Sequence, residues 1–288
     1  MRKFINKLLT FSLFGIVLFF IIIFLNALRV NNSFYKLPNK KYVFLGDSTF
    51  ERGINPSLIK NSLNLSESGT SLVYIYSKLK ALTQIWKPKK IVISMSSHNF
   101  FLDIEKRWLF NQGKFESRLE KYYPIMSKEE IKLFMNSEDV SIIFSIPIVL
   151  KKSLRNILRG NIDYGKYIPQ KSDNLMIAKS ELQKKENKDF IQFAKTEIEY
   201  LRKIVTLCKS SNIDILIVNT PKHPEYNHFY KKRNLLFKQF MKKEFSGSIY
   251  YDYSNLEIEE DFFSDLIHLN QRGSRFFSKY LNEHLLDQ

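Results

Sequence analysis

Residues 42–48 read Tyr-Val-Phe-Leu-Gly-Asp-Ser, four apolar residues followed by a glycine and two polar side chains. A short apolar run is typical of a buried strand, and Gly-Asp-Ser directly behind it is typical of the turn from a strand into a helix. Further short apolar runs lie at 91–95, 213–218 and 249–253, with a possible brief strand at 63–65. These runs predict the strands of one sheet.

Segments with helical periodicity separate the predicted strands. They lie at 56–61, 71–86, 190–210, 229–245 and from about 271 onward. Strands that alternate with helices predict an α/β fold, in which a parallel sheet carries helices on both faces. Ligands bind such sheets at the carboxyl ends of the strands, where Ser48, Asn99 and the loop 265–268 are expected to emerge.

The N-terminal region contains 21 consecutive uncharged residues at 8–28, mostly Leu, Ile, Phe and Val. This length suffices to cross a bilayer as a helix, and it exceeds the roughly 7–15 apolar residues of a cleaved signal peptide. We therefore expect residues 1–28 to form a cytoplasmic tip and a transmembrane anchor. Basic residues flank the run on both sides, so charge hardly decides its orientation; a short basic N-terminus normally stays cytoplasmic, which places the rest of the chain outside.

The remainder of the chain is predicted to be a linker followed by one domain. Residues 29–40 contain Asn31-Asn32-Ser33 and Pro38, which are typical of a linker. Residues 41–288 form the α/β domain. Within it, residues of about 101–189 do not follow the strand–helix alternation and are charged, aromatic-rich and mostly helical in pattern. We interpret them as an insertion into the domain.

The composition indicates an ordered chain that favours anionic surroundings. Apolar residues make up 44% of the sequence, and the net charge is +16, although solubility alone explains a basic surface equally well. No recognition helix, zinc finger or basic motif with interleaved aromatic residues is visible, so nucleic acid is not an expected partner. Cys208 is the only cysteine, which excludes an intramolecular disulfide and a cysteine-based metal site. We expect no metal and no cofactor.

Three side chains have the chemistry of a nucleophilic site. Ser48 follows the first predicted strand, and Asp265 and His268 lie three residues apart near the C-terminus. A hydroxyl nucleophile needs a base and a group that orients the base, which His268 and Asp265 can supply from a single turn. Each residue alone also fits an ordinary role, as a helix cap, a surface acid or a half-buried histidine. Their order and their positions at strand ends favour the catalytic interpretation.

The residues around these three resemble sequence blocks of the SGNH/GDSL hydrolases, a family of flavodoxin-like esterases and acyltransferases. Phe44-Leu-Gly-Asp-Ser48 resembles the first block, and Asp265-Leu-Ile-His268-Leu-Asn270 resembles the last. The resemblance covers about 42–95 and 190–286. It implies that Ser48 is the nucleophile, that its backbone amide is one oxyanion donor, and that Asp265 and His268 complete the catalytic set.

The middle blocks match less closely. Gly69 stands where the family has a glycine after the second strand, which implies that its backbone amide is a second oxyanion donor. Asn99 aligns with an asparagine whose side-chain amide is the third donor. The family's glycine and acidic residue of this block are Ser97 and Phe100 here, so the assignment of Asn99 rests on a degenerate block. His98 beside it is either a pocket residue or an ordinary loop residue.

The ending of the chain is similar to membrane-anchored members of the family that modify bacterial surface glycans, including D-alanyl transfer proteins and polysaccharide O-acyltransferase proteins. The resemblance implies a serine esterase or O-acyltransferase outside the cytoplasm, with a glycan as ester or acceptor and a polytopic membrane acyltransferase as a possible partner. Water and a sugar hydroxyl remain alternative acceptors. Two other possibilities stay open: a non-catalytic accessory or glycan-binding subunit, and a lipid esterase that faces the cytoplasm.

Overall fold

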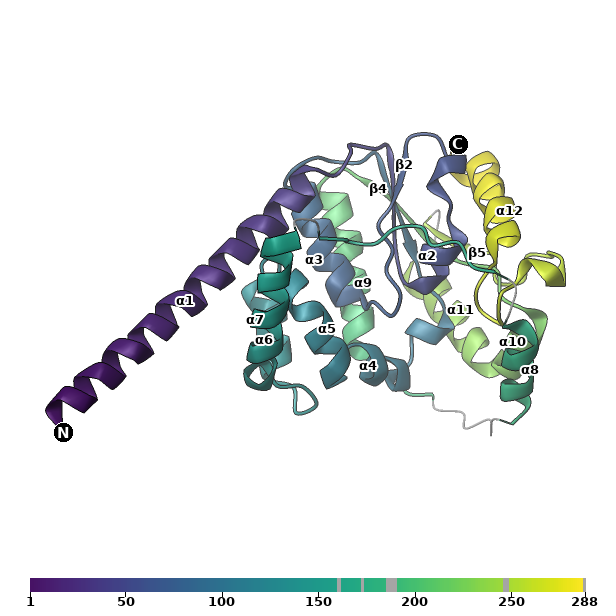
Figure 1. Ribbon diagram of the computed structural model, residues 1–288. Helices are drawn as coiled ribbons and strands as arrows, with labels where there is room; N and C mark the ends of the chain where they lie inside the picture. The colour runs from purple at the N-terminus through teal and green to yellow at the C-terminus, as the bar shows by residue number, and fades with distance from the viewer. Residues whose placement is uncertain (160–161, 172–173, 185–190, 246–248, 287–288) are drawn as a thin grey trace. The chain divides into compact units, whose positions relative to one another are not determined.

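The computed structural model describes residues 1–159, 162–171, 174–184, 191–245 and 249–286 (Figure 1). The chain divides into two compact units. The N-terminal unit consists of Met1–Leu37 and Phe110–Asp163, and the sheet unit consists of Pro38–Leu109 and Tyr164–Gln288.

The sheet unit is built on five parallel strands. They are β1 (Tyr42–Leu45), β2 (Ser62–Asn64), β3 (Lys90–Ser94), β4 (Asp214–Asn219) and β5 (Tyr250–Asp252). Their order in the sheet is β2-β1-β3-β4-β5, and every neighbouring pair is parallel. This is the strand order of flavodoxin-like doubly wound folds. The predicted fold class, a parallel sheet with helices on both faces, is therefore confirmed.

Helices connect the strands as the periodicity predicts. The helices of the sheet unit are α2 (Ser48–Gly53), α3 (Leu72–Thr83), α4 (Leu102–Trp108), α8 (Leu175–Gln183), α9 (Lys195–Ser210), α10 (Pro224–Phe229), α11 (Lys231–Glu244) and α12 (Gln271–Leu281). The predicted helix 56–61 is only a 3-10 turn, Pro56–Leu58. The helix predicted at 229–245 begins earlier and is divided at Tyr230, because Pro224 fits the first turn of α10 and the His223 side chain caps it. The first residue of the helix predicted at 190–210 lies outside the described residues.

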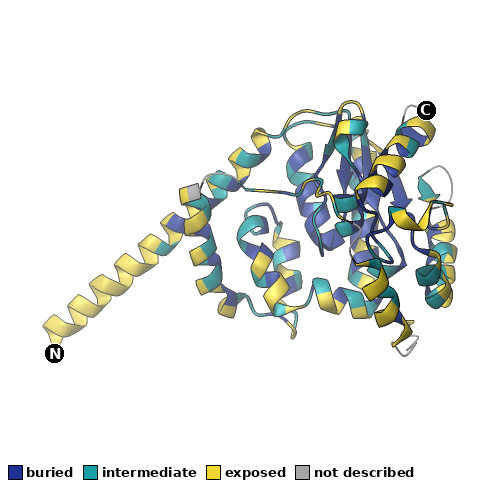
Figure 2. Cartoon of the chain, turned by 45° about the vertical axis from the view of Figure 1, so that its right-hand side comes forward, coloured by how far each residue is buried: buried dark blue, intermediate teal, exposed yellow. Residues whose placement is uncertain are grey.

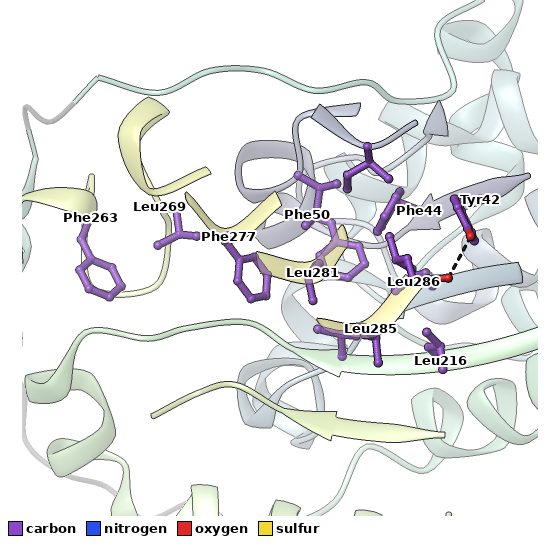
Figure 3. Packing of buried hydrophobic residues seen from close by; sticks show 14 residues of the cluster. Tyr42, Phe44, Phe50, Leu216, Phe263, Leu269, Phe277, Leu281, Leu285 and Leu286 are labelled. Carbon is purple, nitrogen blue, oxygen red and sulfur yellow. Dashed lines mark hydrogen bonds between the residues drawn. The ribbon is translucent and has the colours of Figure 1, made fainter. Parts of the chain in front are cut away.

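The main apolar core lies between the sheet and the pair α2 and α12. Alternate strand residues point into it, among them Phe44 from β1 and Val92 from β3, and they meet Phe50 from α2 and Phe277 from α12 (Figure 3). The hydroxyl of Tyr42 donates a hydrogen bond of 2.9 Å to the carbonyl of Leu286, which joins the first strand to the end of the chain. This packing fixes α2, and therefore the residue at its start, against the sheet.

The other face of the sheet is buried as well. Val43, Leu45, Ile91 and Ile93 alternate with the core residues and are fully shielded from solvent, and the strands at the centre of the sheet are mostly buried in Figure 2. On this side α3 and α9 pack against each other. Burial on both faces explains why the strands are continuous apolar runs instead of alternating patterns.

The N-terminal unit contains the long helix α1 (Arg2–Tyr35) together with α5 (Gln112–Tyr122), α6 (Lys128–Met135) and α7 (Ile142–Arg159). Most residues in the first two thirds of α1 are exposed (Figure 2). The last third buries Ile22, Asn26, Val30 and Phe34, which are spaced by four residues and form one face. α1 is long and apolar enough to be a membrane anchor or a signal sequence.

The boundary predicted between anchor and linker is wrong. Residues 29–35, assigned to the linker, continue α1 as a helix. The reason is tertiary packing: Val30 and Phe34 extend the buried face of the helix, and Arg29 donates a hydrogen bond of 2.8 Å to the carbonyl of Ile157. Two asparagines and a serine tolerate the helix when neighbouring residues are held in this way. Only the segment after Tyr35, with Pro38, leaves the helix.

The predicted insertion contributes to both units. Its middle part, Phe110–Asp163, groups with α1 in the N-terminal unit. The remainder, which includes α4 and α8, belongs to the sheet unit. Residues 160–161, 172–173 and 185–189 of the insertion lie outside the described residues.

Candidate active site

The predicted nucleophile lies at the start of α2. Asp47 caps this helix, because its side chain accepts a hydrogen bond of 2.9 Å from the Thr49 amide. Ser48 is thus the first helical residue, and its hydroxyl lies 2.7 Å from Nε2 of His268, although the two residues are 220 positions apart. The turn after β1 and the loop before α12 therefore meet at the carboxyl end of the sheet, as predicted.

The predicted base, His268, is hydrogen-bonded to the third predicted residue. Nδ1 of His268 lies 2.7 Å from Oδ2 of Asp265, while Oδ1 of Asp265 accepts the amides of Ile267 and His268, both at 2.9 Å. When Nδ1 donates its proton to Asp265, Nε2 is left as the acceptor of the Ser48 proton. Burial opposes ionisation of Asp265, but the hydrogen bond and charge of His268 and the two amides outweigh it, so the pKa of Asp265 lies below its ordinary value.

A cation that the sequence analysis did not identify lies beside this pair. Nη1 of Arg52 lies 3.0 Å from Nδ1 of His268 and 3.8 Å from Oδ2 of Asp265. Arg52 is on the same helix as Ser48, one turn later, where a residue at i+4 shares its face. The spacing of four residues from Ser48 could have indicated Arg52 from the sequence.

Asp47 is the centre of a buried hydrogen-bond network. Oδ1 accepts bonds from the Thr49 amide and from the hydroxyls of Thr49 and Ser94, at 2.9, 2.7 and 3.3 Å. Oδ2 accepts bonds from Nε2 of His98 and Nδ2 of Asn99, both at 2.7 Å. These donors come from α2, from β3 and from the loop after β3, so one carboxylate ties three parts of the site together.

The charge state of this network follows from its surroundings. Burial opposes ionisation of Asp47, yet its hydrogen bonds from His98 and Asn99 and the charge of Lys222 hold its pKa well below the ordinary value. Burial lowers the pKa of His98, and Lys222 acts in the same direction. A neutral His98 can donate Nε2–H to Asp47 and accept the Ser96 hydroxyl at Nδ1, 2.5 Å away. His98 is therefore a structural partner of Asp47 in the loop.

Backbone amides suited to an oxyanion flank the serine. Within the described part of the chain, neither the Ser48 amide nor the Gly69 amide has a hydrogen-bond acceptor. The first residue of a helix has no intrahelical acceptor for its amide, which explains Ser48. Asn99 uses one amide hydrogen on Asp47, and a side-chain amide has a second one to donate. The three donors implied by the resemblance thus belong to the start of α2 and to the segments that follow β2 and β3.

Gly69 occupies a position that only glycine suits. Its φ is +64°, in the left-handed region, and a Cβ at this position would collide with the ring of Trp108. The loop is held by Glu51 of α2, which accepts bonds from the Ser68 amide at 3.1 Å and from the Ser68 hydroxyl. Glu51 therefore connects the helix that carries the predicted nucleophile to the loop that carries Gly69, the predicted second oxyanion donor.

Lys222 is a second residue that the sequence analysis missed. It follows β4, is 4% exposed, and donates to Thr220 Oγ1 at 2.9 Å and to the Ile267 carbonyl at 3.4 Å. Burial lowers its pKa to about 8, against the nearby charges of Asp47 and Asp265. Its position shortly after a parallel strand could have indicated Lys222 from the sequence, since polar residues at the ends of such strands face the site.

The arrangement has the geometry of nucleophilic catalysis by serine. Ser48, His268 and Asp265 are joined in sequence by hydrogen bonds, and the Ser48 amide has no acceptor within the described residues. No group of three or more potential metal-ligating side chains lies together among the residues described. The chemistry that these side chains support is acyl transfer through a covalent intermediate.

A protein-family model matches residues 170–288, the segment with Asp265 and His268. The search of curated proteins found no match. The similar solved structures include a protein from Desulfitobacterium hafniense assigned to the G-D-S-L lipolytic family, with 12% identity, a TM-score of 0.41 and coverage of 85% of this chain and 99% of the other. Another, from Streptococcus pneumonia and described as a platelet activating factor, has 12% identity, a TM-score of 0.44 and coverage of 95% and 99%. The fold assignment stands on the strand order itself.

Proposed function

We propose that this chain is a membrane-anchored serine esterase or O-acyltransferase that acts on acyl esters of cell-surface glycans. The observation that carries the proposal is the pair of 2.7 Å hydrogen bonds that joins Ser48, His268 and Asp265. If Ser48 were only a helix cap, its hydroxyl would bond to an amide of its own helix, and no contact with His268 would be expected.

The first half of the reaction forms an acyl-serine. Nε2 of His268 accepts the proton of the Ser48 hydroxyl while the oxygen attacks the ester carbonyl carbon. The amides of Ser48 and Gly69 and the side chain of Asn99 hold the negative oxygen, and each such donor contributes about 3–4 kcal/mol to stabilisation of the transition state. His268 then returns the proton to the alcohol oxygen as the carbon–oxygen bond breaks, and the alcohol leaves.

The second half releases the acyl group. Water or a sugar hydroxyl gives its proton to His268 and attacks the acyl carbon, and Ser48 leaves with that proton. Asp265 keeps its negative charge throughout and stabilises the protonated histidine. Attack by water makes the protein a deacylase, and attack by a sugar hydroxyl makes it an O-acyltransferase.

α1 supports a location of the reaction outside the cytoplasm. Its apolar and exposed first two thirds support a single membrane span with the N-terminus in the cytoplasm and the sheet unit outside. Surface glycans are then the ester-bearing or acceptor polymers within reach, and a polytopic membrane acyltransferase is the partner that would deliver an acyl group. Protease treatment of intact cells tests this topology, because it should degrade the sheet unit without lysis.

The chemistry is tested with an activated-serine probe on the full chain in detergent. A fluorophosphonate should label the wild-type protein and leave Ser48→Ala unlabelled. Ser57→Ala is the matched control, since Ser57 is an exposed serine nearby and its loss should leave labelling unchanged. If a folded wild-type protein is not labelled, the catalytic proposal fails, and a non-catalytic accessory or glycan-binding subunit becomes the better explanation.

A further inference from the structure

A cavity of about 400 Å³ lies beside His268 within the sheet unit. Its walls include Ile177, Ala178 and Leu182 of α8, Tyr226 and Tyr230 from α10 and the residue after it, and His268 itself. The volume lies within the roughly 300–1,000 Å³ typical of small-ligand sites. We call this space the His268 cavity.

The position of the cavity decides which part of an ester it receives. The carbonyl oxygen of a bound ester must point toward the amides of Ser48 and Gly69. The alcohol oxygen must lie near Nε2 of His268, because that nitrogen donates the proton when the alcohol leaves. A cavity lined by His268 is therefore on the alcohol side of the scissile bond, not on the side of the acyl chain.

One wall of the cavity is a rigid aromatic surface. The rings of Tyr226 and Tyr230 lie 4.7 Å apart between centroids. The guanidinium of Arg233 lies 5.9 Å from the Tyr230 ring centroid and forms an ion pair of 3.0 Å with Asp103. The two rings are thus held in place before any ligand arrives.

The opposite wall is held by a lysine. Lys179 of α8 forms an ion pair of 3.0 Å with Glu225 of α10 and a second, shorter one with Glu260. This contact bridges α8 and α10, the two elements between which the cavity lies. The part of the predicted insertion that contains α8 therefore shapes the cavity.

The walls fit an alcohol of a particular class. Aromatic and aliphatic side chains provide flat apolar surfaces, while Asn174 and Glu181 add polar groups at the wall. A saccharide ring has that pattern, with C–H faces above and below and hydroxyls around its edge. Among the described residues, the ionisable side chains that line the cavity are Glu181, Asp265, His268 and the two tyrosines. Asp265 is paired with His268 and lies 3.8 Å from Arg52, so Glu181 is the acid of the wall whose charge faces a ligand without such a partner in the site.

We propose that the His268 cavity binds a neutral saccharide ring as the leaving or accepting alcohol of the acyl transfer. The assignment of the sugar as the reacting alcohol rests on the proposed function. The binding of a neutral sugar can be measured without any catalysis. The proposal also predicts selectivity, because the carboxylate of Glu181 in the wall disfavours a sugar that carries a carboxylate.

The test is saturation-transfer NMR on the full chain in nanodiscs, carried out in Ser48→Ala so that no ligand is consumed. The probes are methyl β-glucoside, the methyl glycoside of N-acetylglucosamine, methyl glucuronide and cyclohexanol. We expect a neutral glycoside to bind at least fivefold more tightly than the glucuronide, and cyclohexanol to compete poorly. Ala178→Trp should weaken neutral-glycoside binding at least tenfold, because the indole fills the cavity.

Met176→Trp is the matched control, since Met176 lies two residues earlier on α8, is 78% exposed and is not part of the cavity wall. It should change binding less than twofold, and circular dichroism should show that both variants are folded. Equal binding in Ala178→Trp and the control overturns the proposal, and so does strong binding of cyclohexanol alone, which would indicate an apolar alcohol.

The two hypotheses fail in different ways. Sugar binding in Ser48→Ala without fluorophosphonate labelling of the wild type would remove the esterase and leave the cavity as a binding site. Labelling of the wild type with no sugar bound in the cavity would leave the esterase and overturn the saccharide assignment.

Discussion

Glu51, three residues after Ser48 on α2, accepts hydrogen bonds from both the amide and the hydroxyl of Ser68, the residue before Gly69. Glu51 is 8% exposed, and Ser68 donates a hydrogen bond to each of its two carboxylate oxygens. Oxyanion donors must be aimed at the position the oxygen takes in the transition state, and small displacements are costly. Glu51 is therefore a positioning residue for the Gly69 amide.

Replacement of Glu51 by Ala should release the loop and slow acylation of Ser48. Loss of one oxyanion donor costs about 100- to 1,000-fold in rate, so a misplaced donor should cost about 10- to 100-fold. The measurement is the rate of p-nitrophenyl acetate turnover and of fluorophosphonate labelling. We expect kcat to fall while KM changes less than threefold, because the contact to the substrate itself is not removed.

Glu51→Gln is the informative companion, because its carbonyl oxygen can still accept the Ser68 amide. It should recover most of the rate that Glu51→Ala loses. If Glu51→Ala acylates at the wild-type rate, the loop is held by other contacts and the positioning role is wrong.

A second prediction concerns the orientation of the base. In Asp265→Asn the amide can no longer accept the Nδ1 proton as a carboxylate does, so the tautomer with the proton on Nε2 becomes favoured. That tautomer cannot accept the Ser48 proton, and we expect kcat to fall by roughly three to four orders of magnitude at neutral pH. Asp261→Asn, at an exposed aspartate four residues earlier, is the control. A loss smaller than tenfold would mean that Asp265 does not set the tautomer of His268.

The edge of the sheet at which the site lies was predictable from sequence. Ser48 follows the apolar run of β1, and Asn99 lies shortly after the run of β3. Parallel strands bring their carboxyl ends to one edge, so strand identification alone placed these residues together. The position of Asp265 and His268 depended instead on their match to a family block, because no strand directly precedes them.

Other parts of the site depend on contacts that no local pattern records. Glu51 meets Ser68 only because β1 and β2 are neighbours, and Lys222 reaches Ile267 across 45 residues. α1 continues through Tyr35 for the same reason. The end of this helix has low helix propensity, but helices more than 70 residues away along the chain stabilise it. Tertiary packing overrides local preference at such positions.

A third prediction concerns Gly69. Alanine at this position has to adopt a positive φ, which costs about 1–2 kcal/mol, and its methyl group has to displace Trp108. We expect Gly69→Ala to lower the free energy of unfolding by at least 1 kcal/mol in urea titrations and to slow acylation more than tenfold. The double variant Gly69→Ala with Trp108→Ala makes room for the methyl group but leaves the unfavourable positive φ. It should recover part of the activity; no recovery would show that the ring contact is unimportant.

Two buried carboxyl groups link the helices behind the oxyanion loop. Oε2 of Glu105 accepts the Glu197 amide at 3.1 Å, and Oε2 of Glu197 accepts the Leu72 amide at 2.8 Å. Burial, together with the nearby charges of Glu105 and Asp47, raises the pKa of Glu197 to about 8, while its hydrogen bonds act in the opposite direction. Leu72 begins α3, three residues after Gly69, so this carboxyl group supports the loop from behind.

This raised pKa makes the stability of the protein depend on pH. Between the ordinary value of 4.5 and about 8, the folded state binds a proton that the unfolded state has released, so stability is full below pH 4.5 and declines as pH rises to 8. At about 1.4 kcal/mol per pKa unit, the decline attributable to Glu197 amounts to about 5 kcal/mol. Glu197→Gln, which stays neutral, should abolish this decline in urea titrations at pH 5, 6.5 and 8. Glu199→Gln, two residues along α9 at an exposed position, should retain it. Equal pH dependence in the wild type and Glu197→Gln would mean that Glu197 is ionised in the folded protein at neutral pH.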